Sequence, residues 1–312
     1  MNVSVVVCTY SMDRYGPFSE CVESVIAQEY DDLEIVLVVD GNLDVFDRVR
    51  EDFGDEENVV LHNNDENRGI SYSRTKGGEL ATGEIVAFID DDATAEPEWV
   101  RNLVEVYEET NAIAVGGDVL PDWQVEKPDF FPEEFYWLVG CVEPGFAEDG
   151  QEVRNTYGSN ISYLRKAFLN VGGYDPNTGR KGDKHLQAHE APVGIRLREE
   201  YGRGMVFTED AVVHHKLFDY RGEFGWLVSR SFWQGYSKRV MDLLYPDAED
   251  NKSGYLKRLL TQFVPKRAKN LARSPSLAQL QQLVAIFVFT AAVGLGYVYA
   301  MATPNLVEKA NS

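Results

Sequence analysis

The sequence predicts an α/β protein built on a mostly parallel sheet, and two observations support this fold class. Apolar segments rich in β-branched residues recur through the first third of the chain, at Val3 to Cys8, Ile35 to Val39, Val59 to His62 and Ile85 to Ile89. Segments with helical spacing of apolar residues separate them, at Ser19 to Ala27, Leu43 to Phe53 and Ile70 to Ala81. Strands as continuously apolar as these are buried on both faces, which is the arrangement of a parallel sheet covered by helices.

The pattern is less regular in the middle of the chain. A helix is expected from Pro97, since proline suits the first helical turn, and Ile113 to Val115 predicts a strand. The stretch from Gly116 to Arg154 is rich in aromatic residues and prolines; it forms either an insertion that faces an acceptor substrate or loops packed by their own aromatic side chains. Beyond it we expect two helices and two strands, at Arg165 to Val171, Val193 to Tyr201, Gly204 to Thr208 and Ala211 to His214.

Charge is distributed unevenly along the 312 residues. The chain has 51 acidic and 30 basic residues, a net charge of −21. Residues after Asn251 include eight of the basic residues and one of the acidic ones, so residues 1–251 have a net charge of −28. So acidic a body repels a nucleic-acid backbone, which excludes nucleic acid as a general partner, and it is typical of a protein that stays hydrated in concentrated salt. The three cysteines are too few and too scattered for a disulfide framework or a zinc site.

The last sixty residues predict attachment to a membrane. Leu283 to Met301 contains 19 consecutive uncharged residues, close to the length that spans a bilayer, and the alternative is a buried core helix. Tyr255 to Arg273 interleaves apolar residues with cations and has no acid, which favours an amphipathic segment on an anionic membrane surface over a solvated helix face.

These features predict the domain organisation. We expect a body at residues 1–240, a basic juxtamembrane segment at 241–275, a transmembrane helix at 276–302 and a short tail at 303–312. Because the cations precede the span, the body is expected in the cytoplasm.

Polar residues lie at the ends of three predicted strands, where ligands of parallel sheets bind: Thr9-Tyr10, Asp40-Gly41 and Asp90-Asp91-Asp92. Asp90, Asp91 and Asp92 follow Ile89, and three carboxylates so close together repel one another unless a cation compensates them. A hard divalent ion such as Mg²⁺ or Mn²⁺ is the expected cation, and acidic surface decoration is the alternative. Asp40 ends another strand and either accepts a hydrogen bond from a nucleoside or caps the next helix.

Cations and histidines complete this inventory. Arg68, within Asn67-Arg68-Gly69, and Arg74 suit a phosphate, although arginines on an acidic surface more often form salt bridges. His189-Glu190 precedes a helix, and His214-His215 ends a strand. Glu190 can serve as a general base and a strand-end histidine as a metal ligand, although each residue taken singly is more often structural. Together with the three aspartates, they are the set expected for metal-assisted group transfer.

The order of these motifs resembles that of family 2 glycosyltransferases. The resemblance covers roughly residues 1 to 240 and rests on Val-Val-Cys-Thr-Tyr (6–10), Val-Val-Asp-Gly (38–41), Asn-Arg-Gly (67–69), Phe-Ile-Asp-Asp-Asp (88–92), Gly-Ser-Asn (158–160), Val-Gly-Gly-Tyr-Asp (171–175), His-Glu (189–190) and Val-Val-His-His (212–215). It implies the GT-A fold, a nucleotide-diphosphate-sugar donor and a divalent metal cofactor, Mn or Mg.

The resemblance also implies roles for individual residues. Asp90 and Asp92 correspond to the outer positions of the family's D-x-D motif, and His215 to its metal-ligand histidine, with His214 as the rival. Glu190 is implied as the catalytic base, where most members have aspartate. Nucleotide binding is implied for Thr9, Tyr10, Asp40, Arg68, Arg74 and Asp90, and acceptor or sugar binding for Asn160 and Trp233.

Transfer of one sugar at a time is implied because the Gln-x-x-Arg-Trp motif of processive synthases is absent. The acidic composition and apolar C-terminal segment further resemble haloarchaeal members that extend dolichyl-phosphate-linked sugars during N-glycosylation of S-layer glycoproteins. This implies an inverting transfer, of glucuronate from UDP-glucuronate, at the cell membrane. Two alternatives remain at this point, a metal-dependent nucleotidyltransferase and a non-catalytic membrane scaffold that keeps a nucleotide-sugar fold.

Overall fold

The computed structural model describes residues 1–175, 190–246 and 252–303. Their contacts divide them into two compact units. The first unit contains residues 1–120 and the described residues of 147–216. The second contains residues 121–146 together with the described residues from Leu217 onward, and so includes segments that the sequence analysis assigns to the body at 1–240.

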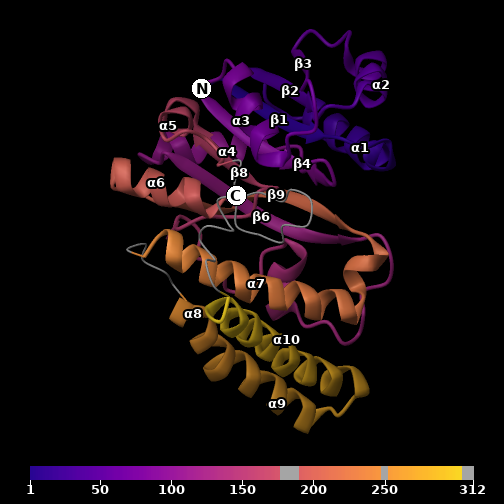
Figure 1. Cartoon of the computed structure of the whole chain (residues 1–312), viewed down its shortest axis with the longest axis vertical. Coiled ribbons are helices and arrows are strands. Elements are labelled where there is room, and N and C mark those ends of the chain that lie inside the picture. The colour runs from indigo at the N-terminus through magenta and orange to yellow at the C-terminus, as the bar shows by residue number, and fades with distance from the viewer. Residues whose placement is uncertain (176–189, 247–251, 304–312) are drawn as a thin grey trace. The chain divides into compact units, whose positions relative to one another are not determined.

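The first unit is organised by one mixed sheet (Figure 1). Its strand order is β3-β2-β1-β4-β8-β6-β9-β5, with β7 paired to β9. The strands are β1 (Val3–Thr9), β2 (Leu33–Val39), β3 (Val59–Asn63), β4 (Ile85–Asp90), β5 (Ala93–Ala95), β6 (Ala114–Trp123), β7 (Glu152–Val153), β8 (Ile161–Leu164) and β9 (Met205–Leu217). The predicted parallel arrangement is confirmed for β3, β2, β1 and β4. From β8 onward the described pairings are antiparallel.

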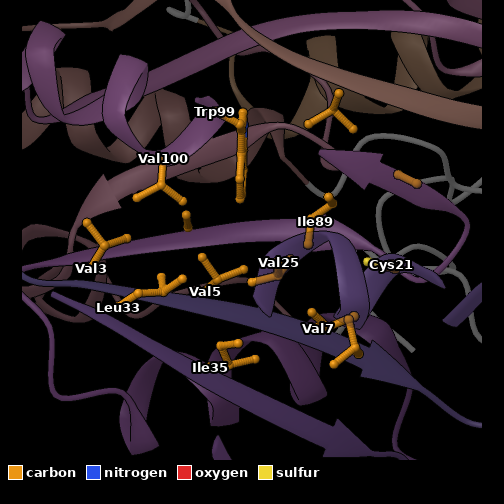
Figure 2. Packing of buried hydrophobic residues seen from close by; sticks show 14 of the residues in the cluster. Val3, Val5, Val7, Cys21, Val25, Leu33, Ile35, Ile89, Trp99 and Val100 are labelled. Atoms are coloured by element: carbon orange, nitrogen blue, oxygen red, sulfur yellow. The ribbon is translucent and has the colours of Figure 1, made fainter. Parts of the chain in front are cut away.

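Helices cover both faces of this sheet. Alternate residues of each strand point to opposite faces, so one strand contributes to two buried clusters. Val5 and Val7 of β1 pack in one buried cluster with residues of α1 (Tyr15–Ile26), α2 (Leu43–Phe53) and α4 (Trp99–Glu109), part of which Figure 2 shows. Val6 and Cys8 pack in a second cluster with residues of α3 (Ile70–Leu80), α5 (Arg165–Asn170) and α6 (Ala191–Tyr201). The apolar strands β1, β2 and β4 are therefore buried on both faces, as expected, whereas β3 at the edge of the sheet is only half-buried.

Some boundaries differ from the predicted ones. The first helix begins at Tyr15 rather than Ser19, directly after a short 3-10 turn at Met12–Arg14. The two strands expected near residues 204–214 form the single strand β9, and the strand expected at Ile113 to Val115 extends to Trp123 as β6. Longer antiparallel pairing explains both extensions, because sheet hydrogen bonds continue through polar residues that interrupt an apolar pattern.

The second unit consists of helices and an aromatic segment. Its helices are α7 (Phe224–Leu244), α8 (Lys252–Arg258), α9 (Val264–Arg273) and α10 (Leu277–Met301), and a π-helical turn at Leu259–Phe263 joins α8 to α9. Phe131 and Phe135, from the stretch of uncertain role in the sequence, are fully buried and pack against Phe289 of α10. That stretch therefore includes loops packed by their own aromatic side chains, as one of the two alternatives held.

Candidate active site

The carboxyl ends of three neighbouring strands form one edge of the first unit's sheet. β1 lies between β2 and β4, with Thr9 opposite Val39 and Cys8 opposite Asp90. Asp40 follows β2, and Asp91 and Asp92 follow β4. The parallel pairing thus brings Thr9, Asp40 and the three aspartates to the same edge, as the sequence predicts.

Asp90, Asp92 and His215 form a group that fits a metal ion. One ligand atom from each of them lies within 4.8 Å of the others, and no other such group occurs among the described residues. Asp92 and His215 are buried, with exposed fractions of 2% and 5%, and His215 Nε2 lies 3.3 Å from Asp92 Oδ1. Two carboxylates and an imidazole are ligands that Mn²⁺ and Mg²⁺ accept, and three protein ligands leave coordination positions for phosphate oxygens.

The pairing of β5 with β9 decides between the two histidines. His215 lies opposite Ala93, immediately after the aspartates, whereas its neighbour His214 points to the other side of the strand. There the Nε2 of His214 lies 3.0 Å from Oε1 of Glu96. The structure therefore places His215, and not His214, beside Asp92.

Asp91 has a different environment from the aspartates on either side of it. Nε and Nη2 of Arg14 donate to its two oxygens at 3.0 and 2.5 Å, and the same Nη2 lies 3.0 Å from Asp92 Oδ2. Burial raises the pKa of Asp91 to about 6, and Arg14 acts in the opposite direction. Sequence reasoning missed Arg14, because nothing local in the sequence shows that its side chain reaches two residues nearly eighty positions away.

Arg74 connects the predicted metal ligand to the predicted base. It lies on α3 and is buried; its Nη2 donates to Asp90 Oδ1 at 2.5 Å and to the Gly158 carbonyl oxygen at 2.9 Å. Its Nη1 lies 3.7 Å from Oε1 of Glu190. A Cβ atom on Gly158 would lie 2.3 Å from Glu190 Oε1 and 2.6 Å from Arg74 Nη1, so any larger residue there would displace these two side-chain ends.

Carboxylates cluster around two arginines at this site. Four carboxylates, those of Asp90, Asp91, Asp92 and Glu190, contact two guanidinium groups, those of Arg14 and Arg74. Such a cluster of acidic groups favours a bound cation. His189, which precedes Glu190, lies outside the described residues.

Asp40 organises the loop that contains the predicted phosphate-binding arginine. Its oxygens accept from the backbone N–H groups of Arg68 and Gly69 and from the side chain of Asn64, at 2.7 to 2.9 Å. Gly69 has a φ of +88°, which favours glycine there. Each carboxylate oxygen can accept two hydrogen bonds, so Oδ2 keeps acceptor capacity for a ligand.

The other predicted nucleotide-binding residues lie at or near the same edge. Thr9 is buried, and its hydroxyl has no hydrogen-bond partner among the described residues. Tyr10 is 51% exposed, so its ring is accessible for stacking. The guanidinium of Arg68 lies 4.2 Å from the ring centroid of Tyr72, and the side chain is exposed.

Asn160 and Trp233 have protein contacts of their own. The Asn160 side chain is fully buried; its amide donates to the Asp118 and Ala211 carbonyls and accepts from the indole of Trp99. These bonds use both hydrogens of the amide and hold β6, β9 and α4 together. Trp233 belongs to the second unit, where it packs edge-on against Phe232 and Tyr236.

Comparisons with known sequences identify the family. Residues 4–172 match Glycosyl transferase family 2. A Haloferax volcanii protein named glucosyl-dolichyl phosphate glucuronosyltransferase is 69% identical over 313 residues, which cover all of both chains. The putative glycosyltransferase EpsH of Bacillus subtilis is 34% identical over 102 residues, which cover 33% of this chain and 29% of that protein.

Solved structures agree on the fold. The mannosyltransferase PcManGT of Pyrobaculum calidifontis, in complex with GDP-Man and Mn²⁺, has a TM-score of 0.59 at 17% identity, covering 96% of this chain and 87% of that one. S. aureus TarS 1–349 in complex with UDP-GlcNAc has a TM-score of 0.56 at 16% identity, covering 100% and 89%. The first unit therefore has the GT-A fold of sugar transferases, as predicted.

The chain belongs to glycosyl transferase family 2, and it is a glycosyltransferase. This assignment decides against the nucleotidyltransferase and the non-catalytic scaffold.

Proposed function

We propose that the protein transfers glucuronate from UDP-glucuronate, with inversion, to a dolichyl-phosphate-linked sugar during S-layer glycoprotein N-glycosylation. The name of the Haloferax relative, which is 69% identical over the full length of both chains, supports this donor and acceptor. The observation that carries the chemistry is Arg74, which contacts both a predicted metal ligand and the predicted base. A site for the leaving diphosphate and a site for the attacking hydroxyl are thereby held side by side.

Asp90, Asp92 and His215 would hold Mn²⁺ or Mg²⁺, and the convergence of two carboxylates and an imidazole within 4.8 Å of one another supports a divalent ion. When bound, such an ion stabilises the negative charge that develops on a leaving diphosphate. Arg14 holds both oxygens of Asp91 and contacts Oδ2 of Asp92, and it would so orient Asp92 as a ligand.

Glu190 would remove the proton from the attacking hydroxyl of the acceptor. Its carboxylate lies beside the guanidinium of Arg74, which orients it, and close to Gly158, whose lack of a side chain gives it room. General bases typically contribute ~10²–10⁴-fold in rate. A single displacement inverts the configuration of the anomeric carbon. No covalent intermediate is formed, so no second carboxylate is needed as a nucleophile.

The donor nucleotide would lie along the strand ends. Tyr10 would stack on the base, the Asp40 carboxylate would accept a hydrogen bond from the nucleoside, and the Thr9 hydroxyl would donate or accept another. Arg68 would approach the diphosphate. Asn160 is better assigned to the sheet, since its buried amide is engaged with β6, β9 and α4. Trp233 on α7, which packs edge-on against Phe232 and Tyr236, would bind the acceptor.

Association with a membrane follows from an acceptor that never leaves the bilayer. The C-terminal helix α10 is long and apolar enough, by length and composition, to enter one. We propose that the first unit, which contains the candidate active site, lies on the cytoplasmic side, where nucleotide sugars are available. Attachment would raise the concentration of the acceptor at the site.

One assay tests the function directly. The purified full chain is incubated with MnCl₂, glucosyl-phosphodolichol and, in parallel reactions, UDP-glucuronate, UDP-glucose and UDP-GlcNAc, and the lipid products are measured by mass spectrometry. We expect a mass increase of one hexuronate, with release of UDP, only from UDP-glucuronate. Transfer of another sugar in preference would overturn the donor assignment, and release of pyrophosphate would overturn the reaction class.

A further inference from the structure

The helix α10 has two unlike faces along its whole length. Its buried residues recur every three or four positions and face the interior of the second unit, at Ala285, Phe289, Ala292, Gly296 and Ala300. Seven of its eight exposed large hydrophobic residues, all except Tyr299, form a stripe with a similar period, which we call the apolar stripe: Leu277, Leu280, Val284, Phe287, Leu295, Val298 and Met301. A helix of 25 residues, about 37 Å long at 1.5 Å per residue, thus exposes apolar side chains on one side and is covered by protein on the other.

The covered face is held close to α7 by two glycines. A Cβ atom on Gly235 of α7 would lie 1.9 Å from the Val293 carbonyl oxygen, and one on Gly296 of α10 would lie 1.8 Å from the Phe232 carbonyl oxygen. Such distances are possible only for glycine. Phe289, near the middle of α10, packs on Phe224, and Ala300, near its end, packs on Val240. The contact with α7 therefore extends over most of the apolar part of α10.

The helix that covers α10 is not suited to a bilayer core. Asp242 of α7 accepts a hydrogen bond from the Tyr297 hydroxyl at 2.8 Å, and Arg239 lies 5.9 Å from the centroid of the same ring. Arg230 and Lys238 are on α7 as well. Charged residues are rare in the hydrocarbon region because their transfer there is unfavourable. A transmembrane α10 would therefore have to leave α7 or draw these charges in with it.

The cations before α10 fall into two groups. Arg267 and Arg258 are turned inward: Arg267 donates to the buried carboxylate of Glu134 at 2.7 to 3.1 Å, and Arg258 lies 3.8 Å from that of Glu143. Lys257, Lys266, Lys269 and Arg273 are exposed, and the structure gives them no ion pair within the described part of the chain. On α9, Lys266, Lys269 and Arg273 share one side of the helix, about 100° to 160° around its axis from Arg267 at about 100° per residue.

We propose that the second unit docks on an anionic lipid surface through the apolar stripe and these exposed cations, with α10 lying in the membrane plane rather than crossing it. α9 packs against α10, and only Ser274 to Ser276 separate the two helices in the chain, so the cations flank the start of the stripe (Figure 1). This inference rests on the membrane attachment in the proposed function, and it specifies how α10 lies relative to the bilayer.

Charge argues for lipid over a second copy of the chain as the occupant. The chain has a net charge of −21, so another copy is repelled, while the stripe and its flanking cations are the part that an anionic leaflet attracts. A basic helix beside an apolar one in the same plane is the arrangement of interfacial rather than spanning segments.

The first experiment determines on which side of the membrane the chain ends. All three native cysteines are buried, so an introduced cysteine can be labelled selectively. One cysteine is added after Ser312 and, in a second variant, Asn111 of the first unit is replaced (Asn111→Cys). Sealed inverted membrane vesicles from cells expressing each full chain are treated with a membrane-impermeant maleimide. We expect both cysteines to react without detergent. Reaction of the C-terminal cysteine only after detergent would show that α10 crosses the membrane and would overturn the proposal.

The second experiment measures docking by flotation of the purified chain with vesicles of phosphatidylglycerol or phosphatidylcholine. Replacing two stripe residues, Phe287→Glu with Leu295→Glu, should weaken binding to either lipid by about a hundredfold or more, since two buried apolar side chains are lost. Replacing Lys266, Lys269 and Arg273 with alanine should weaken binding to phosphatidylglycerol about a hundredfold at about 0.3 M KCl, and much less at about 2 M, where salt screens the cations. Leu43→Glu, at a leucine of α2 that is 69% exposed, is the matched control and should bind as the unaltered chain does.

Two outcomes would overturn the docking surface. Unchanged flotation of the variant Phe287→Glu with Leu295→Glu is one. The other is an unaltered chain that sediments as a dimer while this variant sediments as a monomer, which would make the apolar stripe an interface between two copies. UDP release with a water-soluble glucosyl phosphate as acceptor keeps the two proposals apart. Normal release without flotation would count against docking alone, and flotation without glucuronate transfer would count against the proposed function alone.

Discussion

Buried charge is handled differently in the two units. In the second unit, Glu134 and Glu143 are each matched by one arginine, Arg267 and Arg258, so the pairs are complete without a ligand. In the first unit, Asp90 and Asp92 converge on His215 while Arg14 and Arg74 contact them from the sides. The comparison teaches that a separate carboxylate–arginine pair stabilises the fold, whereas several carboxylates that converge with a histidine form a group suited to a metal ion. Three predictions test this difference and a fourth tests the packing of α10 in the second unit; they run from the largest expected effect to the smallest.

Removing a metal ligand should have the largest effect. Asp92→Asn is expected to abolish metal-dependent donor binding and to lower kcat/KM by ~10³-fold or more, because a charge opposite the leaving diphosphate is lost with the ion. Calorimetry of Mn²⁺ binding and of UDP-glucuronate binding with Mn²⁺ checks this. Asp31→Asn, at an exposed aspartate of the same unit, is the control and should change neither quantity. Unaltered Mn²⁺ affinity in the Asp92 variant would remove it from the metal site.

Removing the base should affect turnover and spare binding. Glu190→Gln keeps the size of the side chain next to Gly158 and Arg74 but cannot accept the proton, so kcat should fall by ~10²–10⁴-fold at an unchanged donor Kd. Glu199→Gln, on an exposed position of the same helix, should leave kcat unaltered. A kcat near that of the unaltered chain in the Glu190 variant would assign the base elsewhere.

Two arginines test the comparison between the units directly. Arg267→Gln leaves the buried Glu134 without its cation, so the free energy of unfolding should fall by about 3 kcal/mol, with or without Mn²⁺. Arg14→Gln leaves Asp91 and Asp92 without theirs, so its loss of stability should be partly reversed by Mn²⁺, which takes over the role of a counter-charge. Denaturant unfolding at zero and about 1 mM Mn²⁺ measures both. Equal rescue of the two variants, or of neither, would contradict the difference we draw.

Two glycines of α10 give the smallest effects and opposite signs. Gly296→Ala forces α10 away from the Phe232 carbonyl and should lower the free energy of unfolding by about 1–3 kcal/mol. Gly294→Ala meets no atom within 4 Å and should raise that free energy by up to about 1 kcal/mol, because alanine is the better helix former. Thermal unfolding of both variants provides the test, and destabilisation by Gly294→Ala would show that its face is covered.

The sequence by itself determined the class of fold and the edge of the sheet where the site lies. A strand buried on both faces is continuously apolar, so β1, β2 and β4 can be predicted without a structure. The polar residues at their ends indicate the edge of the sheet where a ligand binds. The same local pattern predicts the helix α10 but does not predict which residues pack against it. A long uncharged helix has the same sequence pattern when lipid surrounds it and when protein covers one of its faces, so the sequence does not distinguish the two arrangements.

The tertiary structure decided which of these residues meet. It separated His215 from His214 through the pairing of β5 with β9, brought Arg14 to Asp91, and placed Arg74 between Asp90 and Glu190. It also turned Arg258 and Arg267, two of the cations expected at the membrane, toward buried glutamates. The physical reason is the same in each case: periodicity along the chain records how deeply a residue is buried, whereas partners distant in sequence are set by strand register and helix packing.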